Sequence, residues 1–303
     1  MFGNLPLIML LLCAVSRAGW TSTFLIPLLQ ARRLSFAATT RDGRKVADAE
    51  TIKWTFDPKE NLDTAASGNQ FSQLPLAKTV LITFPLTGHG RSELLVHGYK
   101  AAHKGKDVRF IQLGSTGIWQ SSSSSQIQAS HWITRHSPYN KESSRAIAED
   151  ELLALEGCVL NLAGLWGGER QPKNFAGRVA KSKEDVKGKK SLHMIHGQDV
   201  ARAVVAVSEK WDDAGRGQRW MLTDGFVYDW WSLFAGWADE GEADSKEDKD
   251  ADREPSNIAK WAYELMVEED ERALPRSMET LGRCYDVREF WETFGLAPLK
   301  ARI

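Results

Sequence analysis

The first 41 residues constrain the fold of this chain more than any other stretch. Residues 7–15 form a short apolar run (LIMLLLCAV), and the glycine-containing segment 16–20 interrupts it. Apolar residues then recur at helical spacing over residues 21–33. A second strand-like run follows at residues 34–40. A strand, a glycine turn, a helix and a second strand in this order predict the βαβ unit that opens a dinucleotide-binding sheet.

The glycine turn decides whether this unit can hold a dinucleotide, because the backbone must approach a pyrophosphate there. The first turn of the helix then points unpaired N–H groups at the phosphates. Gly19 can serve as the close-approach glycine, but Arg17 and Ser22 stand where the first and third glycines of G-x-G-x-x-G would be. An ordinary strand–turn–helix without a ligand is the alternative. Pro27 predicts that the helix begins late or kinks.

The residue after the second strand faces the adenosine ribose in such a unit. An acidic residue there binds the 2′-hydroxyl of NAD, whereas an arginine suits the 2′-phosphate of NADP. The pair Thr40-Arg41, with Arg44 as possible support, therefore favours NADP over NAD. A surface arginine in a turn is the alternative interpretation.

Composition places the chain among ordinary globular proteins. Of its 303 residues, 42% are hydrophobic and 26% are charged, and the net charge of -1 gives no reason to expect nucleic acid as a partner. Cys13, Cys158 and Cys284 lie far apart without metal-ligand spacing. We therefore expect reduced, buried thiols, no metal site and a cytoplasmic location.

The apolar run at residues 7–15 is too short to span a membrane, and we expect none. It could instead be the core of a secretory signal segment within residues 1–18, which would put the protein on the secretory route. No positive charge precedes it, and its removal would delete the first strand, so we favour the strand.

Strand-like and helical segments alternate along the rest of the chain. The expected strands are 51–56, 79–84, 108–113, 158–162, 192–195 and 219–223. The expected helices are 92–104, 144–155, 200–210, 230–236, 258–267 and 287–294, with Asp199 as the N-cap of the third. This alternation predicts an α/β fold with a doubly wound parallel sheet.

The same alternation suggests two parts. We expect residues 7–165 to form the NAD(P)-binding domain and residues 166–303 to complete the sheet and form a smaller substrate lobe. The acidic stretch 238–255 is expected to be a disordered insertion. Phe84, Pro85 and Leu86 follow the strand 79–84, where the chain lies under the cofactor in such sheets.

Several segments together resemble the extended and atypical short-chain dehydrogenase/reductase superfamily, which includes NAD-dependent epimerases and dehydratases. Ala18-Gly19-Trp20-Thr21 is similar to its cofactor segment, and residues 114–119 (GSTGIW) to its S-[ST]-x-x-V-Y-G segment. Residues 162–170 (LAGLWGGER) and 195–201 (IHGQDVA) resemble its R-L-A-G-I-Y-G-P-G-R and I-H-V-D-D-V-A segments. The order and spacing of these segments match over residues 8–235.

The resemblance implies roles by position. Ser115 falls where the family's catalytic serine or threonine bonds the substrate oxygen, and Thr116 could do the same. Local bonding of both hydroxyls to the backbone is the alternative. The family's redox chemistry uses a tyrosine and a lysine four residues later, and here Arg145 occupies the lysine place. Lys141 occupies the tyrosine place, and Tyr139, two residues earlier, could reach the site only from a loop.

The family likeness implies an NAD(P)-dependent oxidoreductase or epimerase that acts on a small metabolite with a hydroxyl or carbonyl group. A non-catalytic NADP-binding sensor or scaffold is one alternative, because the standard catalytic pair is absent. A degenerate member without cofactor is another, because Arg17 stands at the first glycine position. His196 is either a catalytic base or, as we favour, a loop histidine bonded to the backbone. The family often dimerises through a helix pair, so a homodimer is possible here.

Overall fold

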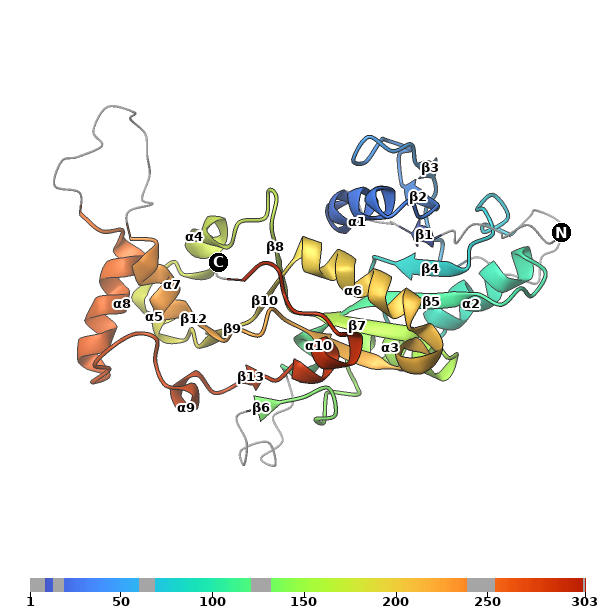
Figure 1. The fold of residues 1–303 in the computed structure, drawn as a ribbon. Helices are drawn as coiled ribbons and strands as arrows, with labels where there is room; N and C mark the ends of the chain where they lie inside the picture. Colours follow the sequence, from blue (N-terminus) through green and yellow to red (C-terminus); the bar gives the residue numbers. More distant parts are fainter. Residues whose placement is uncertain (1–8, 13–18, 60–68, 121–131, 239–253, 302) are drawn as a thin grey trace.

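A parallel sheet forms the centre of the computed structural model, which describes residues 9–12, 19–59, 69–120, 132–238, 254–301 and 303 (Figure 1). The sheet has seven strands in the order β11-β7-β5-β4-β1-β2-β3, and every neighbouring pair is parallel. The strands are β1 (Met9–Leu12), β2 (Phe36–Thr40), β3 (Ile52–Lys53), β4 (Thr79–Ile82), β5 (Arg109–Ser115), β7 (Cys158–Leu162) and β11 (Arg219–Leu222). The predicted doubly wound parallel sheet is thus confirmed.

The strand order reverses next to β1. From β1 the chain builds outward to β2 and β3, then crosses to β4 on the other side of β1. In open parallel sheets of this kind, ligands bind outside the carboxyl ends of the strands at the reversal point. This topology places the candidate site where β1, β4 and β5 end.

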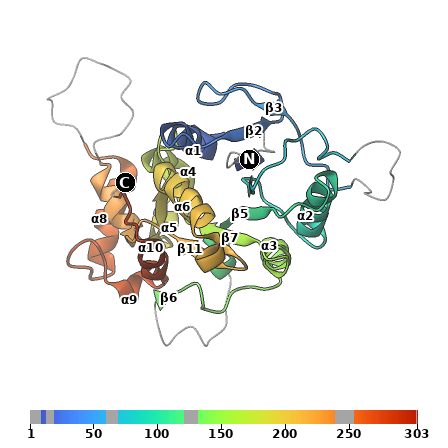
Figure 2. The ribbon, with the colours of Figure 1, turned by 45° about the vertical axis from the view of Figure 1, so that its right-hand side comes forward.

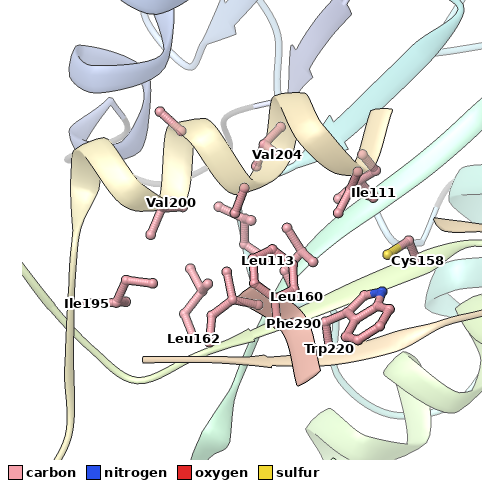
Figure 3. Close-up of a cluster of buried hydrophobic side chains, with 14 of the residues drawn as sticks. Ile111, Leu113, Cys158, Leu160, Leu162, Ile195, Val200, Val204, Trp220 and Phe290 are labelled. Atoms are coloured by element: carbon pink, nitrogen blue, oxygen red, sulfur yellow. The ribbon is translucent and has the colours of Figure 1, made fainter. Parts of the chain in front are cut away.

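Helices α1 (Trp20–Ala31) and α6 (Gly197–Glu209) cover one face of the sheet (Figures 1 and 2). Leu25, Ile26 and Leu29 of α1 are fully buried. Figure 3 shows the continuation of this core under α6, where the side chains of Val200 and Val204 lie close to residues of the central strands. This packing fixes the start of α1 over the carboxyl ends of the strands.

Helices α2 (Arg91–Ala102) and α3 (Ser144–Ala154) cover the opposite face. In β4, Leu81 belongs to the core under α1 and α6, whereas Val80 and Ile82 belong to the core under α2 and α3. All three are fully buried, as expected for a parallel strand that is covered on both sides. The packing of α3 against β5 and β7 brings its first turn to the same edge of the sheet as the end of β5.

The second half of the chain adds small sheets and short helices beside the carboxyl edge. The strand pairs are β8 (Gly164–Trp166) with β10 (Met194–His196), β9 (Ser191–Leu192) with β12 (Tyr228–Asp229), and β6 (Trp132–Ile133) with β13 (Cys284–Tyr285). The helices are α4 (Ala176–Val179), α5 (Lys183–Lys187), α7 (Trp230–Gly236), α8 (Asn257–Glu268), α9 (Met278–Leu281) and α10 (Arg288–Phe294). A buried ion pair between Asp229 and Arg276, 2.6 Å between Oδ1 and Nη2, ties β12 to the segment before α9.

One local prediction is wrong, and one of two alternatives is excluded. Asp199 is not the N-cap of α6, because the helix begins at Gly197, three residues earlier than predicted, and His196 caps it. Of the two effects expected from Pro27, a late start or a kink, the late start is excluded, since α1 runs from Trp20 through Pro27 to Ala31. The expected strand 192–195 is divided between β9 and β10. The acidic insertion lies mostly outside the described residues, as do Ala18 and Cys13.

Cys158 and Cys284 are buried free thiols, as expected from the spacing of the cysteines. Among the residues that the structure describes, no helix is both long enough and apolar enough to cross a membrane. Within the same residues, no group of His, Cys, Asp or Glu side chains could hold a metal ion.

Candidate functional site

Two hollows lie at the carboxyl edge of the sheet and share Pro85 in their walls. The first, which we call the Ser115 cleft, has a volume of about 280 Å³. It is lined by Thr21, Thr83, Pro85, Leu113, Gly114, Ser115, Arg145, Leu162, Ala163 and Leu165. The second, which we call the Phe56 cleft, has a volume of about 340 Å³. It is lined by Phe56, Pro58, Phe84, Pro85, Leu86, Thr87 and Arg91.

Ser115 is the last residue of β5, and its side chain is half-buried in the Ser115 cleft. Its Oγ accepts a hydrogen bond from the backbone N–H of Gly117 at 3.1 Å. No acceptor for the hydroxyl proton of Ser115 occurs among the described residues. The proton therefore remains available for an oxygen atom of a bound molecule.

Thr116 has a different environment from Ser115. It is only 4% exposed, and its hydroxyl donates to the carbonyl of Leu162 at 3.4 Å. Its own carbonyl accepts from the hydroxyl of Tyr285 at 3.2 Å. The Thr116 hydroxyl thus satisfies a local backbone acceptor, and the residue is not part of the cleft wall.

Arg145 lies in the first turn of α3 and lines the same cleft as Ser115 and Thr21. The structure thus brings together four of the residues predicted from sequence, namely Thr21 of α1, Pro85 after β4, Ser115 of β5 and Arg145 of α3. An arginine stays charged at all physiological pH values and donates from a planar group of five N–H bonds. It can bind a ribose hydroxyl, a carboxylate or a phosphate here, but it cannot shuttle a proton.

Tyr139 is not brought to this cleft. Its hydroxyl donates to Oδ1 of Asp150 at 2.7 Å, and the guanidinium of Arg219 lies 4.8 Å from its ring centroid. Burial and the bond to Asp150 raise the pKa of the Tyr139 hydroxyl. Asp150 and Arg219 therefore hold the tyrosine outside the Ser115 cleft in a protonated state.

At the start of α1, Gly19 is the N-cap residue, and its φ of 139° belongs to the region that favours glycine. Among the described residues, no side chain donates to or accepts from the N-terminus of this helix as a cap. Trp20 turns away from the Ser115 cleft, since its indole N–H donates to the carbonyl of Gly167 at 2.9 Å. The guanidinium of Arg170 lies 4.7 Å from the Trp20 ring, and burial lowers the pKa of this arginine.

The three residues predicted to select NADP lie at the end of β2 and in the turn that follows, outside both clefts. Thr40 is buried, and its hydroxyl accepts from the backbone N–H of Gly43 at 2.9 Å. Arg41 and Arg44 are exposed. Arg44 also pairs with Asp42 at 3.5 Å. The turn thus presents two cations and one carboxylate at its surface.

Phe84, Pro85 and Leu86, predicted to lie under the cofactor, form one wall of the Phe56 cleft. The ring centroid of Phe56 lies 5.7 Å from that of Phe84. Arg91, in the first turn of α2, adds a cation to this apolar hollow. Flat apolar walls with one arginine suit a planar, polar ring such as a purine.

His196 has the environment that we favoured from the sequence. Its Nδ1 accepts from the backbone N–H of Gln198 at 3.1 Å. Its ring packs against Trp166 and Phe24, with centroid distances of 4.7 and 5.2 Å. Burial lowers the pKa of the imidazole. His196 is a backbone-bonded histidine that caps α6.

Sequence reasoning missed the polar side chains behind Ser115, namely Glu149, Asn161 and Arg219. One signal was present, because Glu149 follows Arg145 by four residues and so lies on the same face of α3. Nothing in the local sequence marked Asn161 or Arg219, since their meeting depends on the sheet order β5-β7-β11. Phe56 and Arg91 were missed because Phe56 follows β3 and Arg91 begins α2, so that only the folded chain brings them together.

Comparison with known proteins gives matches at the level of structure only. No protein-family model matches the chain, and no curated protein matches it in sequence. An NAD-bound member of the short-chain dehydrogenase/reductase superfamily from Agrobacterium tumefaciens superposes with a TM-score of 0.61 at 10% identity, covering 97% of this chain and 93% of that chain.

Two further solved structures extend this comparison. RMD from Pseudomonas aeruginosa, complexed with NADPH, has a TM-score of 0.54 at 14% identity, with 97% and 95% of the two chains covered. UDP-N-acetylglucosamine 4-epimerase from Bacillus cereus has a TM-score of 0.55 at 9% identity, with 97% and 94% covered. These similarities establish the fold. The chain has the Rossmann-type fold of short-chain dehydrogenases/reductases and NAD-dependent epimerases, as the sequence resemblance predicted.

Proposed function

We propose that the chain binds a nicotinamide dinucleotide, NADP in preference to NAD, and acts as an oxidoreductase or epimerase on a small hydroxyl- or carbonyl-bearing metabolite. The observation that carries this proposal is the convergence of Ser115, Arg145 and Thr21 on one cleft at the carboxyl edge of the sheet. Ligands of doubly wound sheets bind at this edge. Structures of the same fold hold NAD in one case and NADPH in another.

The residues along this edge fit a dinucleotide. Gly19 and the N–H groups of the first turn of α1, for which the described residues provide no side-chain cap, suit a pyrophosphate. The Phe56 cleft suits the adenine ring, and the exposed Arg41 and Arg44 suit a 2′-phosphate. When bound, the nicotinamide would supply or accept a hydride. In this proposal residues 7–165 carry the cofactor, and residues 166–303 complete the sheet and cover the substrate.

Ser115 and Arg145 have separate tasks toward the substrate and the cofactor. The Ser115 hydroxyl is oriented by Gly117 and donates its proton in a hydrogen bond to the reacting oxygen of the substrate. This bond strengthens as charge develops on that oxygen. Arg145 takes the lysine place on α3 and anchors a ribose or a negative group through its N–H donors.

The position of Tyr139 favours a second candidate function. Its hydroxyl is bound to Asp150 and lies outside the Ser115 cleft, so no tyrosine among the described residues lines that cleft. A chain that binds the cofactor but lacks a proton donor would act as an NADP-dependent sensor or scaffold. Cofactor binding is common to both candidates, and turnover separates them.

A titration of the full chain with NADPH and with NADH, followed by quenching of tryptophan fluorescence and checked by calorimetry, tests cofactor binding. We expect micromolar binding of NADPH and weaker binding of NADH. Arg41→Ala should weaken NADPH binding and leave NADH binding unchanged, because only NADPH carries the 2′-phosphate. Binding of neither nucleotide would overturn the proposal.

A panel of small aldehydes, ketones and hydroxy compounds then tests turnover. For any substrate that is turned over, we expect Ser115→Ala to lower kcat by about 100-fold, the effect of removing one donor to a developing oxyanion. NADPH affinity should not change. Unchanged turnover in Ser115→Ala would remove Ser115 from the mechanism, and NADPH binding without turnover of any compound would favour the sensor.

A further inference from the structure

A buried polar network lies directly behind Ser115, on the side of β5 that α3 covers. Glu149 and Asn161 are both 0% exposed, and Arg219 is 7% exposed. The three side chains come from α3, β7 and β11, so the network spans neighbouring elements beside the end of β5, where the Ser115 cleft lies. Ordinary core packing at this place would use apolar side chains, as the rest of these strands does.

The network holds the backbone of Ser115 from both sides. The carboxylate of Glu149 accepts from the N–H of Ser115 through Oε1 at 3.4 Å, and the amide of Asn161 donates to the carbonyl of Ser115 at 3.0 Å. Asn161 also donates to Oε2 of Glu149 at 2.8 Å. One carboxylate and one amide therefore bind both the backbone N–H and the backbone carbonyl of Ser115.

Arg219 neutralises the buried carboxylate and completes the network. Its Nη1 pairs with Oε2 of Glu149 and donates to Oδ1 of Asn161 at 3.0 Å. Its Nη2 pairs with Asp150 at 2.7 Å, the same carboxylate that accepts from Tyr139. Among the described residues, every hydrogen-bond partner of the Glu149 carboxylate is a donor, which suits the ionised form.

Gly114 is the residue that makes room for this arrangement. A Cβ at this position would lie 2.7 Å from Nδ2 of Asn161 and 2.9 Å from Cγ1 of Val159, and it would collide with Oε1 of Glu149. Its φ is not in the left-handed region, so the requirement for glycine here is spatial. At the end of β5, Gly114 thus leaves space for the network, and Ser115 receives its hydrogen bonds.

Burial of a carboxylate and a guanidinium is costly in solvation, and an apolar pair of similar size often stabilises a core as well or better. The ionic network adds directed hydrogen bonds to the backbone of one residue, Ser115. We propose that Glu149 and Asn161 are positioning residues, which hold Ser115 at the angle and depth that its hydroxyl needs in the cleft, with Arg219 as their counter-ion. The catalytic meaning of this positioning rests on the proposed function.

Hydrogen exchange of the full chain tests the positioning without a substrate. In the unaltered protein we expect the backbone N–H groups of residues 114–117 to exchange as slowly as those inside β7, although Ser115 borders an open cleft. In Glu149→Gln, which keeps the shape and removes the charge, exchange over residues 114–117 should be about tenfold faster, with residues 79–82 of β4 unchanged. Asn161→Ala, which keeps the Glu149–Arg219 pair, should give the same local effect.

Glu151→Gln is the matched control on the same helix. Glu151 accepts from the N–H of Gly90 at 2.6 Å, so its change should speed exchange near residue 90 and leave residues 114–117 as they were. Equal acceleration over all strands in Glu149→Gln and Asn161→Ala would mean a general structural role and would overturn the positioning. If neither variant folds, fast exchange at residues 114–117 of the unaltered protein would overturn it.

Turnover provides the second measurement. With any substrate found in the panel above, Glu149→Gln should lower kcat by about 100-fold and leave the KM for NADPH unchanged, because misplacement of one reacting group by about 1 Å has an effect of this size. A fall in NADPH affinity as large as the fall in kcat would contradict positioning of Ser115. If the chain turns over nothing and binds no nucleotide, the proposed function fails, and the exchange data still decide whether Glu149 and Asn161 hold Ser115.

Discussion

The hydroxyl groups of Ser115 and Tyr139 show that the residue type alone does not decide whether a side chain belongs to the candidate site. Both are hydroxyls in the segments that resemble the family's catalytic region, yet only Ser115 lines the cleft. The Tyr139 hydroxyl already has a carboxylate acceptor, Asp150, at 2.7 Å. Its raised pKa also makes it a poor acid near neutral pH.

Tyr139→Phe distinguishes a structural hydroxyl from a proton donor. We expect the variant to lose about 1 kcal/mol of unfolding free energy, the usual contribution of one hydrogen bond, because Asp150 keeps Arg219 as its partner. Turnover of any accepted substrate should change by less than about tenfold. Urea unfolding and steady-state kinetics measure the two effects, and a collapse of kcat in this variant would show that Tyr139 moves into the cleft during the reaction.

Gly114→Ala tests the close packing behind Ser115. The added methyl group would meet Asn161 and Val159 at less than 3 Å, so we expect a loss of about 1–3 kcal/mol of unfolding free energy. Gly177→Ala is the control, since no atom lies within 4 Å of a Cβ there and the residue lies within α4. Alanine in a helix should leave stability unchanged or raise it slightly. Equal stabilities of the two variants in urea would contradict the packing.

At the scale of elements, the first turn of α6 is held by the end of the chain. Asp199 is fully buried, and its carboxylate accepts from the backbone N–H groups of Leu299 and Lys300 at 2.9 and 3.0 Å. It also pairs with Arg202 at 2.8 Å. Asp199 therefore joins α6 to the C-terminal segment.

Asp199→Ala should release the segment around residues 297–301 and lower the unfolding free energy by about 3 kcal/mol, because Arg202 loses its carboxylate partner and the N–H groups of Leu299 and Lys300 lose their acceptor. Carboxypeptidase digestion and urea unfolding detect the two effects. Asp212→Ala is the comparison, since its carboxylate is 69% exposed and its ion pairs should contribute less than about 1 kcal/mol. Resistance of Asp199→Ala to digestion would contradict this anchoring.

Local sequence patterns were sufficient to predict most helices and strands, but they did not predict which distant residues these elements contact. The strand at 158–162 was predicted with the bounds that it has, because all five residues are buried and a loop glycine precedes them. The N-cap of α6 was mispredicted because Asp199 binds residues that are 100 positions away in the sequence. Family resemblance was enough to name Ser115 and Arg145, which line one cleft, as candidates. Glu149, Asn161 and Arg219 meet only through the strand order, which no local pattern encodes.

At the scale of the whole molecule, two buried groups give the stability a dependence on pH with opposite signs. Burial, together with the charge of Arg283, lowers the pKa of His193 to about 3. The unfolded chain binds this proton near pH 6.5, so the stability that His193 contributes is complete above that pH and falls as the pH drops toward 3. Burial raises the pKa of Asp224 to about 6, so its contribution grows as the pH falls from 6 toward 3.8.

A comparison with His193→Gln isolates the histidine, because Asp224 acts in both proteins. The imidazole accepts from the backbone N–H of Tyr285 through Nε2 at 3.1 Å, and glutamine can offer a neutral acceptor in its place. Between pH 7.5 and 5.0 we expect the unaltered chain to lose about 2 kcal/mol more unfolding free energy than the variant. The reason is that, over this range, His193 binds a proton in the unfolded state but not in the folded state. Equal losses in urea unfolding at the two pH values would mean that His193 is protonated in the native state, which its 4% exposure and its role as acceptor for Tyr285 both oppose.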